Sequence, residues 1–164
     1  MTGQAITAQS ADSFGFGYGE HLLVWTWRRI AMGQAGCPLI AEEFSHACGE
    51  DAAEVFITFC TFLRALGYAA RRRVQIAHPG CRILTGDERQ LLTLLAAAQA
   101  DNRAHFDAHL RWLTHAERRN ALAIAAHALG SALKAHDLRL SLPASIGPMT
   151  CERSSTPRAV VVAT

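Results

Sequence analysis

A capping box at Thr85 and Glu88 constrains the fold of this chain more than any other feature of its sequence. Glu88 stands three residues after Thr85, and a leucine-rich run begins directly behind them at Leu91. In such a box the threonine side chain accepts a hydrogen bond from the glutamate backbone, and the glutamate side chain bonds back to the threonine backbone. A helix must begin at this point, and the pattern predicts one over residues 86–100.

The segment before this helix differs from the rest of the chain. His78-Pro79-Gly80 places proline and glycine as a tight turn requires, and a short basic run, Arg71-Arg72-Arg73, precedes it. Val74 and Ile76 alternate with polar neighbours, which is typical of an extended segment. We therefore expect a short irregular or β-ribbon connector at residues 69–84. It should lie on the helices, because an isolated two-stranded ribbon is only marginally stable.

Hydrophobic residues recur at helical spacing on both sides of the connector. The expected helices cover residues 20–35, 38–48, 51–66, 86–100, 103–115 and 117–136. The helix at 51–66 is apolar nearly all round, as expected in the centre of a bundle or across a subunit interface. The sequence thus predicts an all-α fold, a single bundle of about six helices. We expect a flexible arm at residues 1–17, the helical domain at 18–142 and a flexible tail at 143–164.

Composition narrows the class of protein. The chain has 164 residues, half of them hydrophobic, and a net charge of +2, which is too small to demand an acidic partner. The N-terminus lacks the pattern of a secretory signal, and the longest strongly apolar run, Val55–Leu63, is shorter than the ~20 residues that cross a bilayer. Five cysteines without regular spacing fit a reducing compartment. We expect a cytoplasmic protein that does not enter a membrane.

The best candidates for metal ligands are Asp101, His105 and His109. Their spacing would place all three on one face if the helix begins early enough, and such a ladder could hold a divalent metal. The competing and favoured interpretation is structural, because His109 adjoins the apolar stripe of Phe106 and Leu110. The spacing between Cys37 and Cys48, with His21 and His46 nearby, does not fit a structural zinc site.

Two features of the connector suggest other chemistry. Cys81 lies beside Arg82 and near His78, and positive neighbours favour the thiolate, so Cys81 is a candidate reactive thiol. Without a nearby acidic residue or second cysteine, a plain connector cysteine is the alternative.

The arginines Arg71, Arg72 and Arg73 are candidate anion contacts. Helix 38–48, helix 51–66 and a basic ribbon resemble the order of a winged helix-turn-helix. That mode is disfavoured, because helix 51–66 would present phenylalanines rather than polar side chains to the bases.

The sequence lacks the nucleophile-elbow and phosphate-loop motifs, no cofactor is favoured, and enzyme activity is left open. The leading hypothesis is a non-catalytic interaction or adaptor protein that acts as a homodimer, with an unidentified protein as a further potential partner. A domain this small can hide about one fully apolar helix, so further apolar surface needs a second subunit. The candidate interface residues are Phe14, Phe16, Tyr18, Trp25, Trp27, Phe56, Phe59 and Phe62.

Two alternatives remain open. The first is a small-molecule or metal-binding helical protein, with or without enzyme activity, that uses Asp101, His105 and His109 or Cys81. The lesser alternative is a nucleic-acid-binding regulator.

Overall fold

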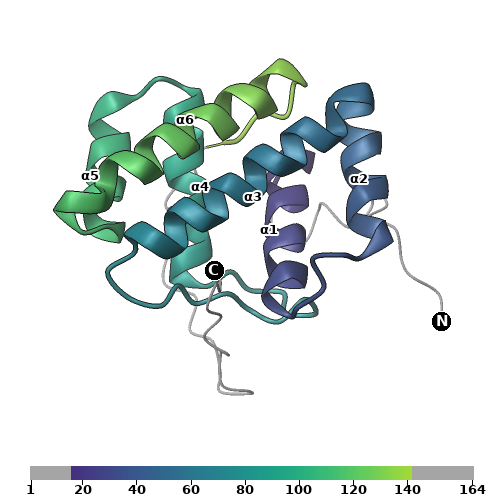
Figure 1. The fold of residues 1–164 in the computed structure, drawn as a ribbon, viewed down its shortest axis with the longest axis horizontal. Helices are drawn as coiled ribbons and strands as arrows, with labels where there is room; N and C mark the ends of the chain where they lie inside the picture. The colour runs from purple at the N-terminus through teal and green to yellow at the C-terminus, as the bar shows by residue number, and fades with distance from the viewer. Residues whose placement is uncertain (1–15, 142–164) are drawn as a thin grey trace.

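The computed structural model describes residues 16–141, and within that range the chain is helical with no β-strand (Figure 1). The predicted all-α fold is confirmed. The helices are α1 (Tyr18–Ala31), α2 (Pro38–Cys48), α3 (Ala52–Ala69), α4 (Gly86–Gln99), α5 (Arg103–Leu113) and α6 (Arg119–Ala135), with 3-10 turns η2 (Gly49–Asp51) and η3 (Ala116–Arg118). Nearly all of the predicted arm and tail, including Phe14, falls outside the described residues.

The expected number of about six separate helices is not confirmed. Because α2, η2 and α3 follow one another without a gap, the described residues can be divided into five helical segments. By length and composition alone, the stretch Pro38–Ala69 could also cross a membrane. In the fold it bends at Gly49, whose φ is 59°, and α3 packs most extensively against α6. The core helix of a globular bundle can also have this length and apolar composition.

The starts of α4 and α5 follow from local side-chain capping. The Thr85 hydroxyl accepts the Glu88 N–H at 3.0 Å, and the Thr85 N–H donates to Glu88 Oε2 at 2.8 Å. The predicted capping box at the start of α4 is therefore confirmed. Helix α5 begins behind Asn102, whose side-chain oxygen accepts the His105 N–H at 3.2 Å.

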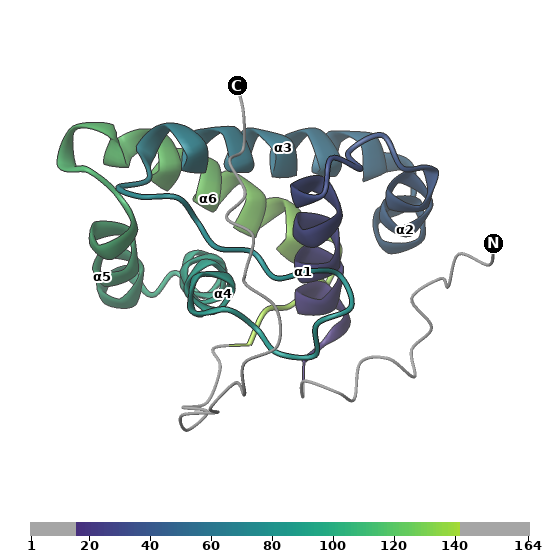
Figure 2. The ribbon, with the colours of Figure 1, turned by 90° about the horizontal axis from the view of Figure 1, so that it is seen from below.

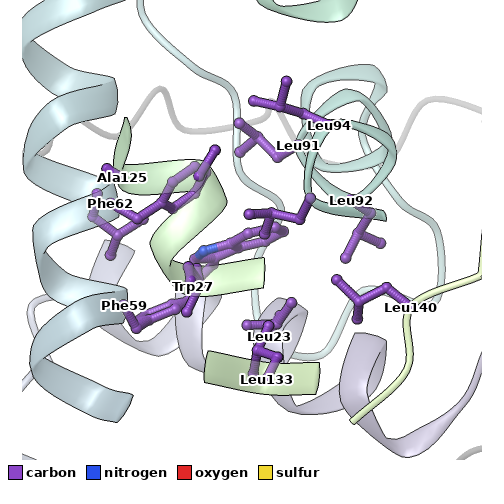
Figure 3. Close-up of a cluster of buried hydrophobic side chains, with 14 of the residues drawn as sticks. Leu23, Trp27, Phe59, Phe62, Leu91, Leu92, Leu94, Ala125, Leu133 and Leu140 are labelled. Carbon is purple, nitrogen blue, oxygen red and sulfur yellow. The ribbon is translucent and has the colours of Figure 1, made fainter. Parts of the chain in front are cut away.

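Helix α3 lies across the bundle and α6 packs along it, while α4 packs against both α5 and α6 (Figure 2). Helix α1 contributes Trp27, which projects among Phe59 and Phe62 of α3 and leucines of α4 (Figure 3). The Trp27 and Phe59 rings stack with their centroids 6.3 Å apart. Gly130 lets α6 approach α4, because a Cβ at that position would lie 3.3 Å from the Gln99 nitrogen.

The core corrects the argument that helix 51–66 needs a second subunit. Trp27 is 2% exposed and Phe59 and Phe62 are 0% exposed, so the chain itself covers all three side chains. Phe56 is half-buried and packs against Phe44 of α2 at 5.2 Å between ring centroids. The outward face of α3 instead carries Ile57, which is 65% exposed.

Candidate functional site

An ion pair that is buried in the protein ties α1 to the start of α4. Arg28 Nε lies 2.7 Å from Glu88 Oε1, and the two side chains are 3% and 0% exposed. Arg28 Nη2 donates to Glu88 Oε2 at 2.9 Å, which makes the pair bidentate. Arg28 Nη1 donates to the Cys81 carbonyl at 2.6 Å, and Nη2 also donates to the Ile83 carbonyl at 2.9 Å. The guanidinium therefore fixes the end of the connector as well as α4.

Carboxylates of α4 accept hydrogen bonds from the connector backbone and hold it in place. The Ala77 N–H donates to Glu88 Oε1 at 3.1 Å, and the Gln75 N–H donates to Asp87 Oδ2 at 2.7 Å. The Thr85 hydroxyl donates to the Gln75 carbonyl at 2.6 Å. The predicted β-ribbon is not confirmed. The alternation of Val74 and Ile76 with polar residues marks an extended segment whose hydrogen bonds go to the first turn of α4.

Asp87 also binds the arginine run. Arg72 forms a bidentate ion pair with Asp87, at 2.6 Å and 2.8 Å. Burial acts to raise the pKa of the Asp87 carboxyl, but the hydrogen bonds from Arg72 and the Gln75 N–H, with the Arg72 charge, outweigh it. The pKa of Asp87 therefore lies below its ordinary value. The carboxylate stays ionised and keeps the connector in place.

The connector, held in this position, forms one wall of a cavity. Figure 2 shows it running from the end of α3 past α1 and back to the start of α4. Between these elements lies a cavity of about 160 Å³ that is partly open to solvent. Its apolar walls come from α1, α3, α4 and the connector, and are formed by Trp27, Ile30, Ala31, Leu63, Leu66, Val74, Ile76 and Leu91. Gly67, Ala70, Arg72 and Arg73 complete the lining.

The two arginines of the lining differ in their partners. Arg72 is neutralised by Asp87, and its guanidinium lies 5.1 Å from the centre of the Trp112 ring. Arg73 is exposed and forms no ion pair with any described residue. One uncompensated positive charge therefore borders an otherwise apolar cavity. The indole nitrogen of Trp27 is also buried without a hydrogen-bond partner among the described residues.

The predicted ladder of Asp101, His105 and His109 is broken. Asp101 precedes α5 and takes a positive φ of 55°, so it does not share the helix face of the two histidines. The His105 and His109 rings lie 6.1 Å apart between centroids, and His109 Nδ1 contacts the side-chain oxygen of Gln90. Burial, with the nearby His105, lowers the pKa of His109. Within residues 16–141, no three His, Cys, Asp or Glu side chains cluster closely enough to hold a metal ion.

The four cysteines within residues 16–141 are free thiols. Cys81 is half-buried, and its thiol contacts the Ile83 carbonyl at 3.4 Å. Its own carbonyl accepts from Arg28, so the structure gives Cys81 a place in the connector network. Cys48 is buried in the core of α2, where burial and the charge of Asp51 raise the pKa of its thiol. Cys37 contacts Arg29 Nη1 at 3.6 Å.

The remaining interface candidates near the N-terminus have partners within the chain. The Tyr18 hydroxyl donates to Glu43 Oε2 at 3.0 Å, and burial, with that carboxylate, raises the pKa of Tyr18. Arg29 lies over the Trp25 ring at 4.7 Å. Phe16 is half-buried and packs against the core. All three aromatic side chains thus have partners within a single chain.

No sequence pattern identified Arg28 and Asp87 as residues that organise the connector. Arg28 lies on a helix face that periodicity marks as apolar, and its partner is 60 residues away. Asp87 lies two residues after the capping Thr85, in the first turn of α4, where an acidic residue is expected for the helix dipole alone. The basic run Arg71-Arg72-Arg73 directly before an extended segment was the one local signal of a charged partner.

Comparisons with protein-family models, with curated proteins and with solved structures find no match to this chain.

Proposed function

We propose that this protein binds a small, mainly apolar carboxylic acid in the cavity between α1, α3, α4 and the connector. The observation that carries the proposal is the cavity itself, about 160 Å³ beside Trp27 with mostly apolar walls. An apolar cavity of roughly 150 Å³ engineered into another protein stays dry and binds benzene. A ligand of about ten non-hydrogen atoms is therefore the size class we propose.

Arg73 supports the choice of a carboxylate. It lines the cavity and has no ion-pair partner among the described residues. A guanidinium presents paired donors that match the two oxygens of a carboxylate. The apolar body of the ligand would pack against Trp27, Leu66 and Leu91, and its charged end would lie toward Arg73.

The connector supports a binding role because its position does not depend on the ligand. Asp87 and Glu88 hold residues 75 and 77 from the first turn of α4. A site whose walls are already in place loses less conformational entropy when a ligand binds. This hypothesis keeps the small-molecule alternative from the sequence but moves it away from Asp101, His105, His109 and Cys81.

A titration with benzoate, followed by NMR of the tryptophan indole N–H groups, tests the proposal. Benzoate should shift the Trp27 resonance and bind with a Kd of about 0.1–1 mM, as expected for so few atoms. Arg73→Gln should weaken benzoate about fivefold and leave uncharged benzyl alcohol unaffected. Ala31→Leu should fill the cavity and abolish both, whereas Ala104→Leu, at an exposed position on α5, should change neither. Benzoate binding that survives Ala31→Leu would rule out this cavity.

Homodimerisation is a second candidate function. The interface proposed here uses other residues than those named from the sequence. Ile57 of α3 and Ile124 of α6 are 65% and 68% exposed, and their two helices pack side by side. Large apolar side chains on neighbouring helices suit an interface between two copies. Light scattering should then return twice the 17.8 kDa monomer mass, and Ile57→Glu should return the monomer. A monomer mass for the unmodified protein at micromolar concentration would remove this candidate.

A further inference from the structure

The C-terminal ends of α3 and α5 are joined into one end of the molecule. Ala70 and Thr114 form an antiparallel bridge, the Arg71 N–H donates to the Leu113 carbonyl at 3.0 Å, and the His115 N–H donates to the Ala69 carbonyl at 3.1 Å. Figure 2 shows the end of α3 beside the start of α6, on the side of the molecule where α5 lies. Residues 64–73 and 111–119 therefore share one surface, which we call the basic-aromatic surface.

Charge is concentrated on this surface. Residues 64–73 and 111–119 contain seven arginines and one acidic residue, Glu117. Arg72 is paired with Asp87, but Arg64, Arg71, Arg73, Arg111 and Arg118 are exposed and form no ion pair with a described residue. The other end of α3 has the opposite character, since residues 42–54 contain five acidic residues and no arginine or lysine. The protein is close to neutral overall but strongly polarised along α3.

Two aromatic rings stand in solvent among these arginines. Trp112 is 51% exposed with the Arg72 guanidinium 5.1 Å from its centre, and Tyr68 is 58% exposed with that of Arg118 at 4.8 Å. Arg118 also donates to the Tyr68 carbonyl at 3.2 Å. Each ring is thus held in place by an arginine and still offers aromatic surface to solvent.

We propose that the basic-aromatic surface binds single-stranded nucleic acid. Exposed rings provide stacking surfaces for unpaired bases, and the surrounding arginines neutralise phosphates. Protein interfaces are also enriched in arginine and aromatic residues, but several arginines without a described ion-pair partner, beside a single acidic residue, favour a partner that carries a phosphate at every position. It differs from the winged-helix mode, since it uses no recognition helix and needs bases that are free to stack. Arg72 and Arg73 border both the cavity and this surface, but the proposal rests mainly on Tyr68, Trp112 and arginines that do not line the cavity.

Fluorescence anisotropy with labelled 12-residue oligouridine and oligothymidine tests the proposal. If about four arginines contact phosphates, affinity should fall about 50-fold between 50 and 200 mM salt, since each single-strand contact contributes roughly −0.7 to the logarithmic salt slope. Trp112→Ala should weaken binding by about tenfold, within the range for loss of one stacked base, and Trp112→Phe should restore most of it. Oligouridine and oligothymidine separate RNA from DNA as the source of the strand, and tight binding of either supports the proposal.

Charge variants provide the matched control. Arg111→Glu, on the surface, should weaken binding several-fold, whereas Arg139→Glu, an equal charge change at a 76%-exposed side chain elsewhere, should leave it unchanged. Circular dichroism should be the same for all variants. The proposal is overturned if neither strand binds at 50 mM salt, or if the two charge variants behave alike. It is also overturned if duplex DNA binds as tightly and Trp112→Ala has no effect, or if polyglutamate competes as well as oligouridine, which would indicate an acidic protein partner.

Discussion

Replacing Glu88 with glutamine should destabilise the fold more than any other single isosteric change in the described region. Each carboxylate oxygen accepts two donors, Arg28 Nε and the Ala77 N–H at Oε1, and Arg28 Nη2 and the Thr85 N–H at Oε2. Glutamine must place its NH₂ group at one of these two positions. The two N–H groups that bind there would then face a donor instead of an acceptor. The substitution also leaves the Arg28 charge buried without its counterion.

Removal of one partner from a buried ion pair costs about 3–5 kcal/mol. That is a large part of the roughly 5–15 kcal/mol of a typical domain, so the variant should fold but melt about 10–15 °C lower. Urea unfolding followed by circular dichroism measures the change in free energy. Glu117→Gln, an exposed substitution of the same type, should change stability by no more than about 0.5 kcal/mol.

The double variant Arg28→Met/Glu88→Leu separates the charge from the connector contacts. It removes both charges together, so it should be less destabilising than the sum of the single variants. It should not restore full stability, because the Cys81 and Ile83 carbonyls and the Ala77 N–H would lose their partners. The role given to this network would be refuted if Glu88→Gln lowers the free energy of unfolding by less than about 1 kcal/mol and leaves its slope with urea concentration unchanged.

Three smaller perturbations test neighbouring features. Thr85→Ala should cost about 1 kcal/mol through loss of the helix cap, and unchanged urea unfolding would argue against that capping role. The pKa of His109 is lowered in the fold, so the unfolded state binds its proton more readily; stability should fall as pH drops below about 6.5, and His109→Gln should reduce that fall. The pKa of Asp87 is likewise lowered, so its contribution should be present at neutral pH and be lost as pH falls below about 3.8. Asp87→Asn should therefore reduce the loss of stability at acid pH. If the loss remains equally steep, other carboxylates cause it.

Local sequence signals predicted where helices start, but they could not identify interaction partners that are far apart in the sequence. The capping box at Thr85 depends on residues three apart, so the sequence was sufficient to place the start of α4. The same Glu88 side chain binds Arg28, which no local pattern could select. The β-ribbon alternative for the connector is not confirmed for the same reason. Val74 and Ile76 have strand-like spacing, but the backbone N–H groups of Gln75 and Ala77 donate to carboxylates on α4.

Competition between neighbouring residues explains the failure of the metal ladder. Asn102 caps α5, which places Asp101 one residue before the cap and in a left-handed conformation. Asparagine is a preferred N-cap, so this start was available from the sequence. The burial of Phe59 and Phe62 was not, because it depends on how α1 and α6 pack against α3. An apolar helix looks the same in sequence whether its own chain or a second subunit covers it.

A crystal soaked in 4-bromobenzoate tests the central claim of a carboxylate-binding cavity most directly. Anomalous scattering from bromine locates the ligand independently of the protein density. The account predicts a single strong peak in the cavity near Trp27 and Leu66, with the carboxylate directed toward Arg73 and the connector still held by Asp87 and Glu88. A cavity filled by protein side chains, or a bromine peak found only elsewhere on the molecule, would contradict it.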